Sequence, residues 1–131
     1  MSFGQRNYDR TRPEIEFPGD NPPEELVIED IAEGSGQAVQ AGDRVSCHYL
    51  GVAWSTGAEF DASWNRGQPL DFQVGVGQVI KGWDDGLLGM KLGGRRRLEI
   101  PPHLAYGDAG AGGEIGPGET LIFVVDLVGI N

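Results

Sequence analysis

The fold is decided by residues 81–88, which read KGWDDGLL. This stretch carries the helical pattern of the chain, because Trp83 and Leu87 are spaced i, i+4 and share one face. Asp84 and Asp85 lie in its first turn, where negative charge complements the helix dipole. Gly89 is a suitable C-terminal stop. We therefore expect one short helix that buries the face carrying Trp83 and Leu87.

Outward from this helix, both flanks of the sequence have the patterns of β-strands. Residues 44–54 and 70–74 alternate apolar and polar side chains, as half-buried strands do. Residues 121–130 form an almost unbroken apolar run, which suits the centre of a sheet. Further strands are expected at residues 26–31, 59–61 and 95–100. Strands that do not alternate with helices predict an α+β fold, in which an antiparallel sheet wraps around the single helix.

A run of three arginines occupies the expected strand at 95–100. Arg95, Arg96 and Arg97 form a basic cluster in an otherwise acidic protein. Charged side chains protect exposed strand edges from pairing with other chains. We interpret the run as a solvated edge of the sheet.

The composition indicates a soluble protein. The 131 residues carry 20 acidic and 10 basic side chains, for a formal net charge of −10. This balance repels nucleic acid and anionic membrane surfaces, and no apolar run approaches the ~20 residues of a membrane span. The N-terminus lacks the apolar core of a signal peptide. We expect a cytoplasmic monomer with no nucleic-acid or membrane partner.

The chain divides into a tail and a domain. Residues 1–25 are polar and contain several prolines, with no apolar period, so we expect a flexible or loosely attached tail. Residues 26–131 have the patterns of one compact domain of ordinary size.

The cysteine and histidines do not indicate reactive chemistry. Cys47 is the single cysteine, so no intramolecular disulfide forms, and its alternation with Val45 and Tyr49 predicts a buried, inert thiol. His48 and His103 have no ligand-like spacing with each other or with Cys47. We expect neither a metal nor another cofactor.

Aromatic side chains from separate elements form the candidate site. Taken singly, each is most simply a core residue. Tyrosine hydroxyls need partners when buried, however, and Asp61, directly after Phe60, could meet one of them. Polar groups around an apolar hollow are typical of a small-ligand site. The candidate set is Tyr49, Phe60, Phe72, Trp83, Tyr106 and Phe123, with Val79, Ile80 and Ile115 beside them.

Five ordered segments carry a family resemblance. They are CHYLG at 47–51, GAEFDAS at 57–63, VIKGWDDGLLGM at 79–90, IPPHLAYG at 100–107 and TLIFVVDLV at 120–128. In sequence and spacing, residues 26–131 resemble the FK-binding (FKBP-type) peptidyl-prolyl cis–trans isomerases. The resemblance implies an antiparallel half-barrel sheet around one short helix. It also implies an enzyme without cofactors that binds X-Pro segments of polypeptides and the macrolide ligands of the family.

The resemblance also implies the roles of the site residues. Trp83 would form the pocket floor, and the Ile80 backbone N–H and the Tyr106 hydroxyl would face the carbonyls of the ligand. Asp61 would act as an electrostatic and structural group rather than as a general base. The implied catalytic residues are Asp61, Tyr106 and Tyr49. The implied substrate-binding residues are Phe60, Val79, Ile80, Trp83, Ile115, Phe123 and Leu70.

The sequence departs from the family pattern at the rim. Leu70 stands where an aromatic residue often lies, Ala111 and Glu114 lie in the long loop, and Gly116-Pro117 replaces a double proline. These positions bear on macrolide affinity and on preference for the residue before proline.

Two alternatives keep the same fold. One is a non-catalytic module that binds proline-containing partners. The other is a folding helper for unfolded chains, a role that in this family usually accompanies an inserted domain or a helical extension, whereas the loop at 105–120 is short. An unrelated structural β-domain is the third reading, and the five ordered segments argue against it.

Overall fold

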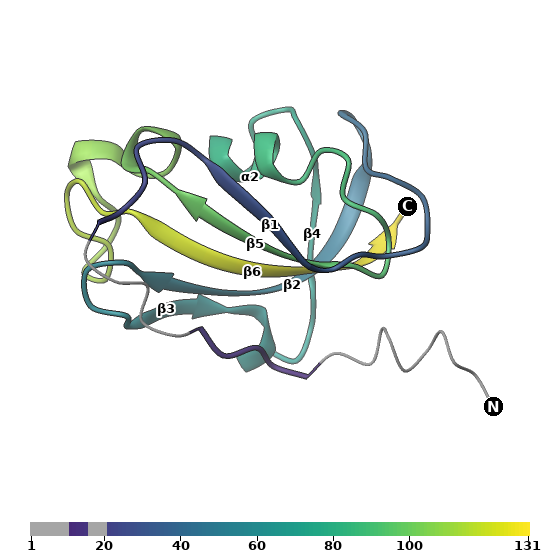
Figure 1. The fold of residues 1–131 in the computed structure, drawn as a ribbon, viewed down its shortest axis with the longest axis horizontal. Helices are drawn as coiled ribbons and strands as arrows, with labels where there is room; N and C mark the ends of the chain where they lie inside the picture. Colours follow the sequence, from purple (N-terminus) through teal and green to yellow (C-terminus); the bar gives the residue numbers. More distant parts are fainter. Residues whose placement is uncertain (1–10, 16–20) are drawn as a thin grey trace.

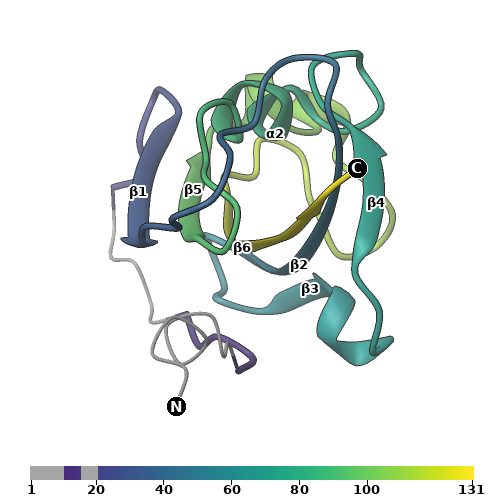
Figure 2. The ribbon, with the colours of Figure 1, turned by 90° about the vertical axis from the view of Figure 1, so that its right-hand side faces the viewer.

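Six antiparallel strands curve around one short helix, α2 (Lys81–Gly86), in the computed structural model, which describes residues 11–15 and 21–131 (Figures 1 and 2). The spatial order is β1-β5-β6-β2-β3, and β4 also pairs with β2. The strands are β1 (Val27–Ala32), β2 (Arg44–Ala53), β3 (Glu59–Ala62), β4 (Leu70–Gln73), β5 (Arg95–Ile100) and β6 (Leu121–Ile130). The predicted α+β half-barrel is confirmed.

β6 is the central strand, as its sequence predicts. It pairs with β5 on one side and with β2 on the other, and its residues 121–127 are all buried. One face of the sheet packs on α2 (Figure 2). The continuous apolar run is explained because both faces of this strand are covered.

Two short strands share one edge of β2. β4 pairs with its first half, from Arg44 to Cys47, and β3 pairs with its second half, from Leu50 to Val52. The register shifts between Gly51 and Val52, which marks a β-bulge. A 3₁₀ turn, η1 (Ser63–Asn65), follows β3 and begins the connection to β4.

The helix packs closely on β5. Trp83 is 3% exposed and Leu87 is 2% exposed, which confirms the predicted buried face. The helix ends at Gly86, two residues before the predicted end, and Leu87 serves as its C-cap. A Cβ atom at Gly82 would lie 2.4 Å from a methyl carbon of Ile100, so glycine permits this approach.

The predicted solvated edge at the arginine run is wrong. β5 lies between β1 and β6, and Arg96 is only 8% exposed. Arg96 Nε donates to Asp30 Oδ1 at 2.7 Å, and its Nη1 donates to the carbonyls of Gly86 and Leu88 at 2.9 and 3.2 Å. A guanidinium at these carbonyls satisfies the C-terminal end of the helix. The charge is therefore tolerated inside the sheet because it has specific partners.

Cys47 is buried in the main core, as predicted. Burial raises the pKa of its thiol far above the usual value, and the nearby carboxylates of Asp126 and Asp71 add to this shift. A thiol in such surroundings disfavours the reactive thiolate.

Part of the N-terminal tail lies against the outer face of the sheet (Figure 2). Within residues 11–15, Pro13 is buried and Ile15 packs on Val52, Trp54 and Ile122. This packing differs from the loose attachment predicted for residues 1–25. Residues 1–10 and 16–20 of that prediction lie outside the described residues. None of the helices in the described part of the chain has the length and hydropathy of a membrane span.

Candidate functional site

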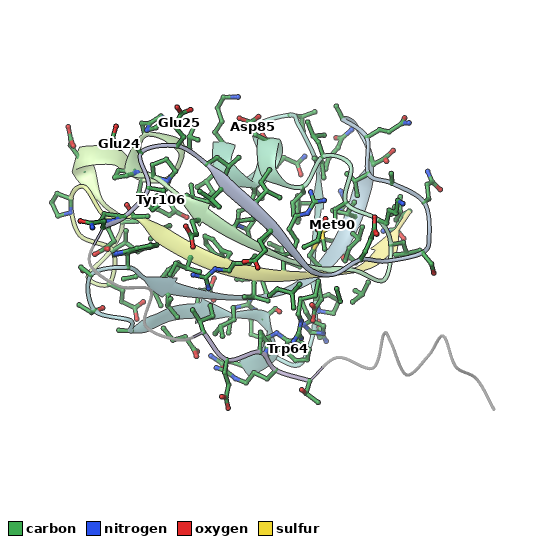
Figure 3. All side chains as sticks on the ribbon, viewed as in Figure 1. Glu24, Glu25, Trp64, Asp85, Met90 and Tyr106 are labelled. Atoms are coloured by element: carbon green, nitrogen blue, oxygen red, sulfur yellow. The ribbon has the colours of Figure 1, made fainter. Side chains whose placement is uncertain are left out.

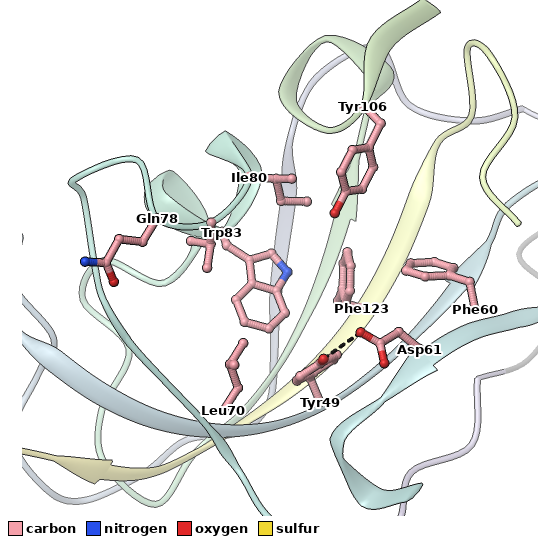
Figure 4. Close-up of a pocket in the computed structure, with 10 residues that line it drawn as sticks. Tyr49, Phe60, Asp61, Leu70, Gln78, Ile80, Trp83, Tyr106 and Phe123 are labelled. Carbon is pink, nitrogen blue, oxygen red and sulfur yellow. Dashed lines mark hydrogen bonds between the residues drawn. The ribbon is translucent and has the colours of Figure 1, made fainter. Parts of the chain in front are cut away.

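A hollow of about 200 Å³ opens on the concave side of the sheet beside α2 (Figure 4). The helix, four strands and two loops contribute to it. Its lining residues are Tyr49, Phe60, Asp61, Leu70, Gln78, Val79, Ile80, Trp83, Tyr106 and Phe123.

Aromatic rings form the floor and walls of the hollow. Trp83, from α2, meets Tyr49 and Phe123 edge to face, with ring centroids 5.1 and 5.2 Å apart. Phe60 meets Phe123 in the same way at 5.5 Å. Such edge-to-face pairs have preferred geometries, so each ring restricts the orientation of its neighbour.

Gly51 makes room for two of these walls. It lies opposite Phe123 in the β2–β6 register. A Cβ atom at position 51 would lie 2.7 Å from ring carbons of both Phe123 and Phe60. The absence of a side chain on this strand therefore lets the two rings meet over the sheet.

A three-residue polar network borders the hollow. The Tyr49 hydroxyl donates to Asp61 Oδ2 at 2.6 Å (Figure 4). Arg66 donates from Nη1 to Asp61 Oδ1 at 3.0 Å and from Nη2 to the Tyr49 hydroxyl at 2.8 Å. Burial, and then the hydrogen bond to Asp61, raise the pKa of Tyr49, while Arg66 acts in the opposite direction. Both carboxylate oxygens of Asp61 thus accept a hydrogen bond from a defined donor.

Two further donors lie over the aromatic floor. The Ile80 carbonyl accepts hydrogen bonds from the first turn of α2, whereas its backbone N–H has no partner among the described residues. Tyr106 is 40% exposed, and its hydroxyl points into the hollow without a partner in the described part of the chain (Figure 4). The hollow therefore offers two free donors above its aromatic floor, and the buried indole N–H of Trp83 is a third donor without a partner among the described residues.

The loop before α2 is fixed by the helix. The Asp84 carboxylate accepts hydrogen bonds from the backbone N–H groups of Gly75 and Gly77 at 2.8 and 3.0 Å. The Gln78 side-chain carbonyl accepts one from the backbone of Gln73 at 2.9 Å. Asp84 therefore does more than complement the helix dipole, because it also holds the loop that presents Val79 and Ile80.

The structure brings together every predicted site residue except Phe72 and Ile115. Phe72 is buried in the main core, where its ring centroid lies 5.4 Å from that of Trp83. Ile115 is buried in the main core cluster, and its backbone pairs with Ala111 across a tight loop in which Glu114 is exposed. Leu70 does line the hollow, at the position where the resemblance implies an aromatic residue.

Sequence reasoning missed Gln78 and Arg66. Gln78 directly precedes the predicted Val79, which was the available signal. Arg66 lies in the loop after η1, five residues beyond Asp61. A basic residue close in sequence to a candidate carboxylate was the signal for its role.

This arrangement defines a class of site. The described residues hold no group of three or more His, Cys, Asp or Glu side chains that could bind a metal ion. The site is a small pocket with an aromatic floor and a polar border, the kind of concave surface that binds small ligands.

Comparison with known proteins agrees with this class. Residues 35–128 match the family described as FKBP-type peptidyl-prolyl cis-trans isomerase. The chain is 68% identical over 120 residues to the FK506-binding protein of Streptomyces anulatus, which covers 91% of this chain and 97% of the relative. It is 58% identical to FK506-binding protein 1A of Neurospora crassa, over 81% of this chain and 88% of the relative.

A solved structure gives the same result. The crystal structure of AtFKBP13 superposes with a TM-score of 0.76 at 41% identity, covering 81% of this chain and 93% of that one. The chain therefore belongs to the FKBP-type peptidyl-prolyl cis–trans isomerase family. It is an enzyme that isomerises X-Pro bonds of proline-containing peptides, as the resemblance implied.

Proposed function

We propose that the hollow over Trp83 is the catalytic site of this isomerase and that it works without covalent chemistry. The prolyl ring of the substrate would rest on Trp83, between the rings of Phe123 and Phe60. The X-Pro linkage would rotate beside Asp61 and Tyr49.

The reaction requires only selective binding of a twisted amide. The barrier to rotation is about 20 kcal/mol, and uncatalysed exchange takes ~10–100 s at room temperature. The barrier reflects amide resonance, which is lost when the C–N bond twists. A protein that binds the twisted form more tightly than the planar form therefore lowers the barrier.

The aromatic walls favour the twisted amide. The planar amide is the more charge-separated form, so its removal from water is the more costly. Trp83, Phe123 and Tyr49 are all nearly buried and leave little room for solvent at the floor. The hollow therefore disfavours the planar ground state relative to the transition state.

The polar groups orient the substrate. The free Ile80 N–H and Tyr106 hydroxyl would donate to the carbonyls that flank the prolyl ring and hold them in a turn. Asp61 is engaged at both oxygens by Tyr49 and Arg66, so we assign it an electrostatic role instead of proton transfer. Fixed contacts that together stabilise the transition state by roughly 4 kcal/mol raise the rate about 10³-fold.

The assignment depends mainly on one observation, which is that two unpaired donors lie over a buried indole. Donors that are removed from water normally have partners, and a ligand bound in the hollow would cover both of these. A ligand with carbonyl oxygens on either side of an apolar ring would supply those partners, and an X-Pro segment has this arrangement.

A pair of tryptophan variants tests the site. Trp83→Phe removes part of the floor, whereas Trp54→Phe removes the same group from the outer face of the sheet. We expect kcat/KM for X-Pro peptides to fall about tenfold in Trp83→Phe, as ~1.4 kcal/mol of lost ring contact implies. We expect Trp54→Phe to remain near wild type. Peptide-induced fluorescence changes should disappear in Trp83→Phe alone. Equal kinetics in the two variants would exclude Trp83 as the floor.

FK506 is the ligand we propose for the same hollow. The relatives at 68% and 58% identity are named FK506-binding proteins. Leu70 lies at the rim and Glu114 is exposed on the neighbouring loop, so we expect these positions to set macrolide affinity. FK506 should compete with X-Pro peptides.

We also propose that the protein acts as a cytoplasmic monomer without nucleic-acid or membrane partners. The net charge of −10 supports the absence of nucleic-acid and anionic membrane partners, since it opposes association with polyanions.

A further inference from the structure

Residues 11–15, here called the N-terminal strap, contact the sheet on the face opposite helix α2 (Figure 2). We propose that the strap is a positioning element for the Asp61 network, in which Arg12 holds the η1 turn against β3. The effect of the strap on the positions of Asp61 and Arg66 does not depend on the proposed mechanism. Its expected effect on the isomerisation rate does rest on the proposed function.

Arg12 joins the beginning of β3 to the end of η1. Its Nη2 donates to Glu59 Oε1 and to Asn65 Oδ1, the latter at 3.3 Å. Asn65 in turn donates from Nδ2 to Glu59 Oε2 at 2.9 Å. These hydrogen bonds hold the pKa of Glu59 below its ordinary value of 4.5, and the one from Arg12 has the largest effect. The three side chains thus form a closed polar cluster.

Asp61 and Arg66 of the polar network at the hollow lie one or two residues from this cluster, on β3 and just after η1. Asp61 follows Glu59 by two residues on β3, and Arg66 directly follows Asn65. Arg66 bonds both Asp61 and the Tyr49 hydroxyl. Arg12 and Arg66 therefore join the same strand to the same turn, and a shift of η1 relative to β3 must move the Arg66 donors.

The beginning of η1 is fixed on β2, because the buried Ser63 hydroxyl accepts a hydrogen bond from the backbone N–H of Tyr49 at 2.7 Å and Trp64 stacks on His48. Its end at Asn65 is held instead by the exposed side chains of Arg12 and Glu59. η1 has three residues, and β3 has four and lies at the end of the strand order. The pairing of β3 with β2 is interrupted by a bulge. Short edge elements with few backbone bonds open most easily, so side-chain contacts have a large share in their geometry.

The strap itself is anchored on both sides of Arg12. Before it, the Thr11 carbonyl accepts a hydrogen bond from Arg95, which is itself paired with Asp126. After it, Pro13 is buried and Ile15 packs on the outer cluster. Trp64, in the middle of η1, lies on the strap side of the sheet, whereas Tyr106 and Asp85 lie on the helix side (Figure 3). An anchored backbone reduces the entropy cost of the exposed Arg12 ion pair.

The test replaces Arg12 in the full-length chain. Arg12→Gln removes the cation, and Arg12→Lys keeps one. Glu14→Gln is the control within the strap, because Glu14 is exposed, and Arg44→Gln is the control for charge, because Arg44 is an exposed arginine at the start of β2. NMR without any peptide would measure the carboxyl pKa of Glu59 and the signals of Asp61 and the Arg66 guanidinium.

We expect Arg12→Gln to raise the pKa of Glu59 toward 4.5 and to move the Asp61 and Arg66 signals toward solvent-exposed values. On X-Pro peptides, kcat should fall about two- to fivefold with little change in KM, the range that one exposed ion pair can supply. Arg12→Lys should recover part of both effects, and the two controls should match wild type.

A rise in the Glu59 pKa with unchanged Asp61 and Arg66 signals would overturn the inference, because Arg12 would then be only a surface ion pair. If wild type gave no turnover that depends on Trp83, the proposed mechanism would fail. Shifted Asp61 and Arg66 signals in Arg12→Gln would even then support the strap as a positioning element.

Discussion

Replacement of Gly51 by alanine tests whether the pocket walls must be rigidly placed. The added Cβ atom would lie 2.7 Å from ring carbons of Phe60 and Phe123, against 3.4–4 Å for ordinary contacts. The rings must therefore retreat by about 0.7 Å or the strand must shift by as much. Phe123 is buried in the main core, so Phe60, which is only partly buried, has more freedom to move.

The size of the effect follows from this overlap. Insertion of one methyl group into a well-packed site costs about 1–3 kcal/mol of stability. A displacement of reacting groups by about 1 Å can cost on the order of 10²-fold in rate. We expect Gly51→Ala to lower kcat/KM for X-Pro peptides about 10- to 100-fold while the protein still folds.

Gly129→Ala is the matched control. It makes the same change in a neighbouring strand of the sheet, but its Cβ atom would lie 3.4 Å from Ser46, at ordinary contact distance. Protease-coupled or NMR exchange assays give kcat/KM, and thermal unfolding shows whether both variants remain folded. A folded Gly51→Ala protein with the activity of Gly129→Ala would refute the claim that these walls need their present positions.

Two further predictions concern titratable groups. Cys47→Ser places a hydroxyl in an apolar core, so we expect unfolding free energy to fall by about 1–3 kcal/mol with kcat unchanged; loss of kcat in the folded variant would contradict an inert thiol. The raised pKa of Tyr49 means that the folded state favours the neutral hydroxyl. The resulting stabilisation is complete below pH 10 and is lost as pH rises through the raised pKa. Denaturant titrations between about pH 9 and 11.5 should show this decline, and Tyr49→Phe should show a flatter profile; an equal slope in both proteins would exclude Tyr49 as its source.

The helix and the central strand could be predicted because local pattern and tertiary environment agree. Trp83 and Leu87 repeat with the helical period, and residues 121–127 are buried and, apart from Asp126, apolar. In these elements, the apolar positions of the sequence pattern are the positions that are buried in the structure. The pocket residues followed from the family resemblance, since no periodicity links side chains on four strands and a helix.

Arg95 and Arg96 could not be placed because their partners are far away in sequence, whereas Arg97 pairs with Glu99 two residues away. Asp30 lies 66 residues before Arg96, and Asp126 lies 31 residues after Arg95. Local reasoning assigns such charges to solvent, as their burial without partners would be costly. Only the strand order shows that the guanidinium groups of Arg95 and Arg96 meet acidic groups.

The sequence of β2 indicates that its outward face is covered, and the prediction of a loose tail did not use this pattern. On β2, Ser46 and His48 are the polar positions of the outward face, but the same alternation continues with Leu50, Val52 and Trp54. All three are buried. An outward face that turns apolar along one strand requires a cover.

Both faces of β2 thus bear on the pocket. Between Tyr49 and Val52 the strand presents the walls of the hollow on one side and the outer cluster on the other. Selective binding of a twisted amide depends on walls that keep their position within fractions of an ångström. A sheet packed on one face only can flex toward solvent, whereas a sheet packed on both faces resists displacement, because interiors are close-packed. The strap therefore makes this part of the half-barrel a layered structure, and the rigidity that catalysis needs at Gly51 has a source on each side of the strand.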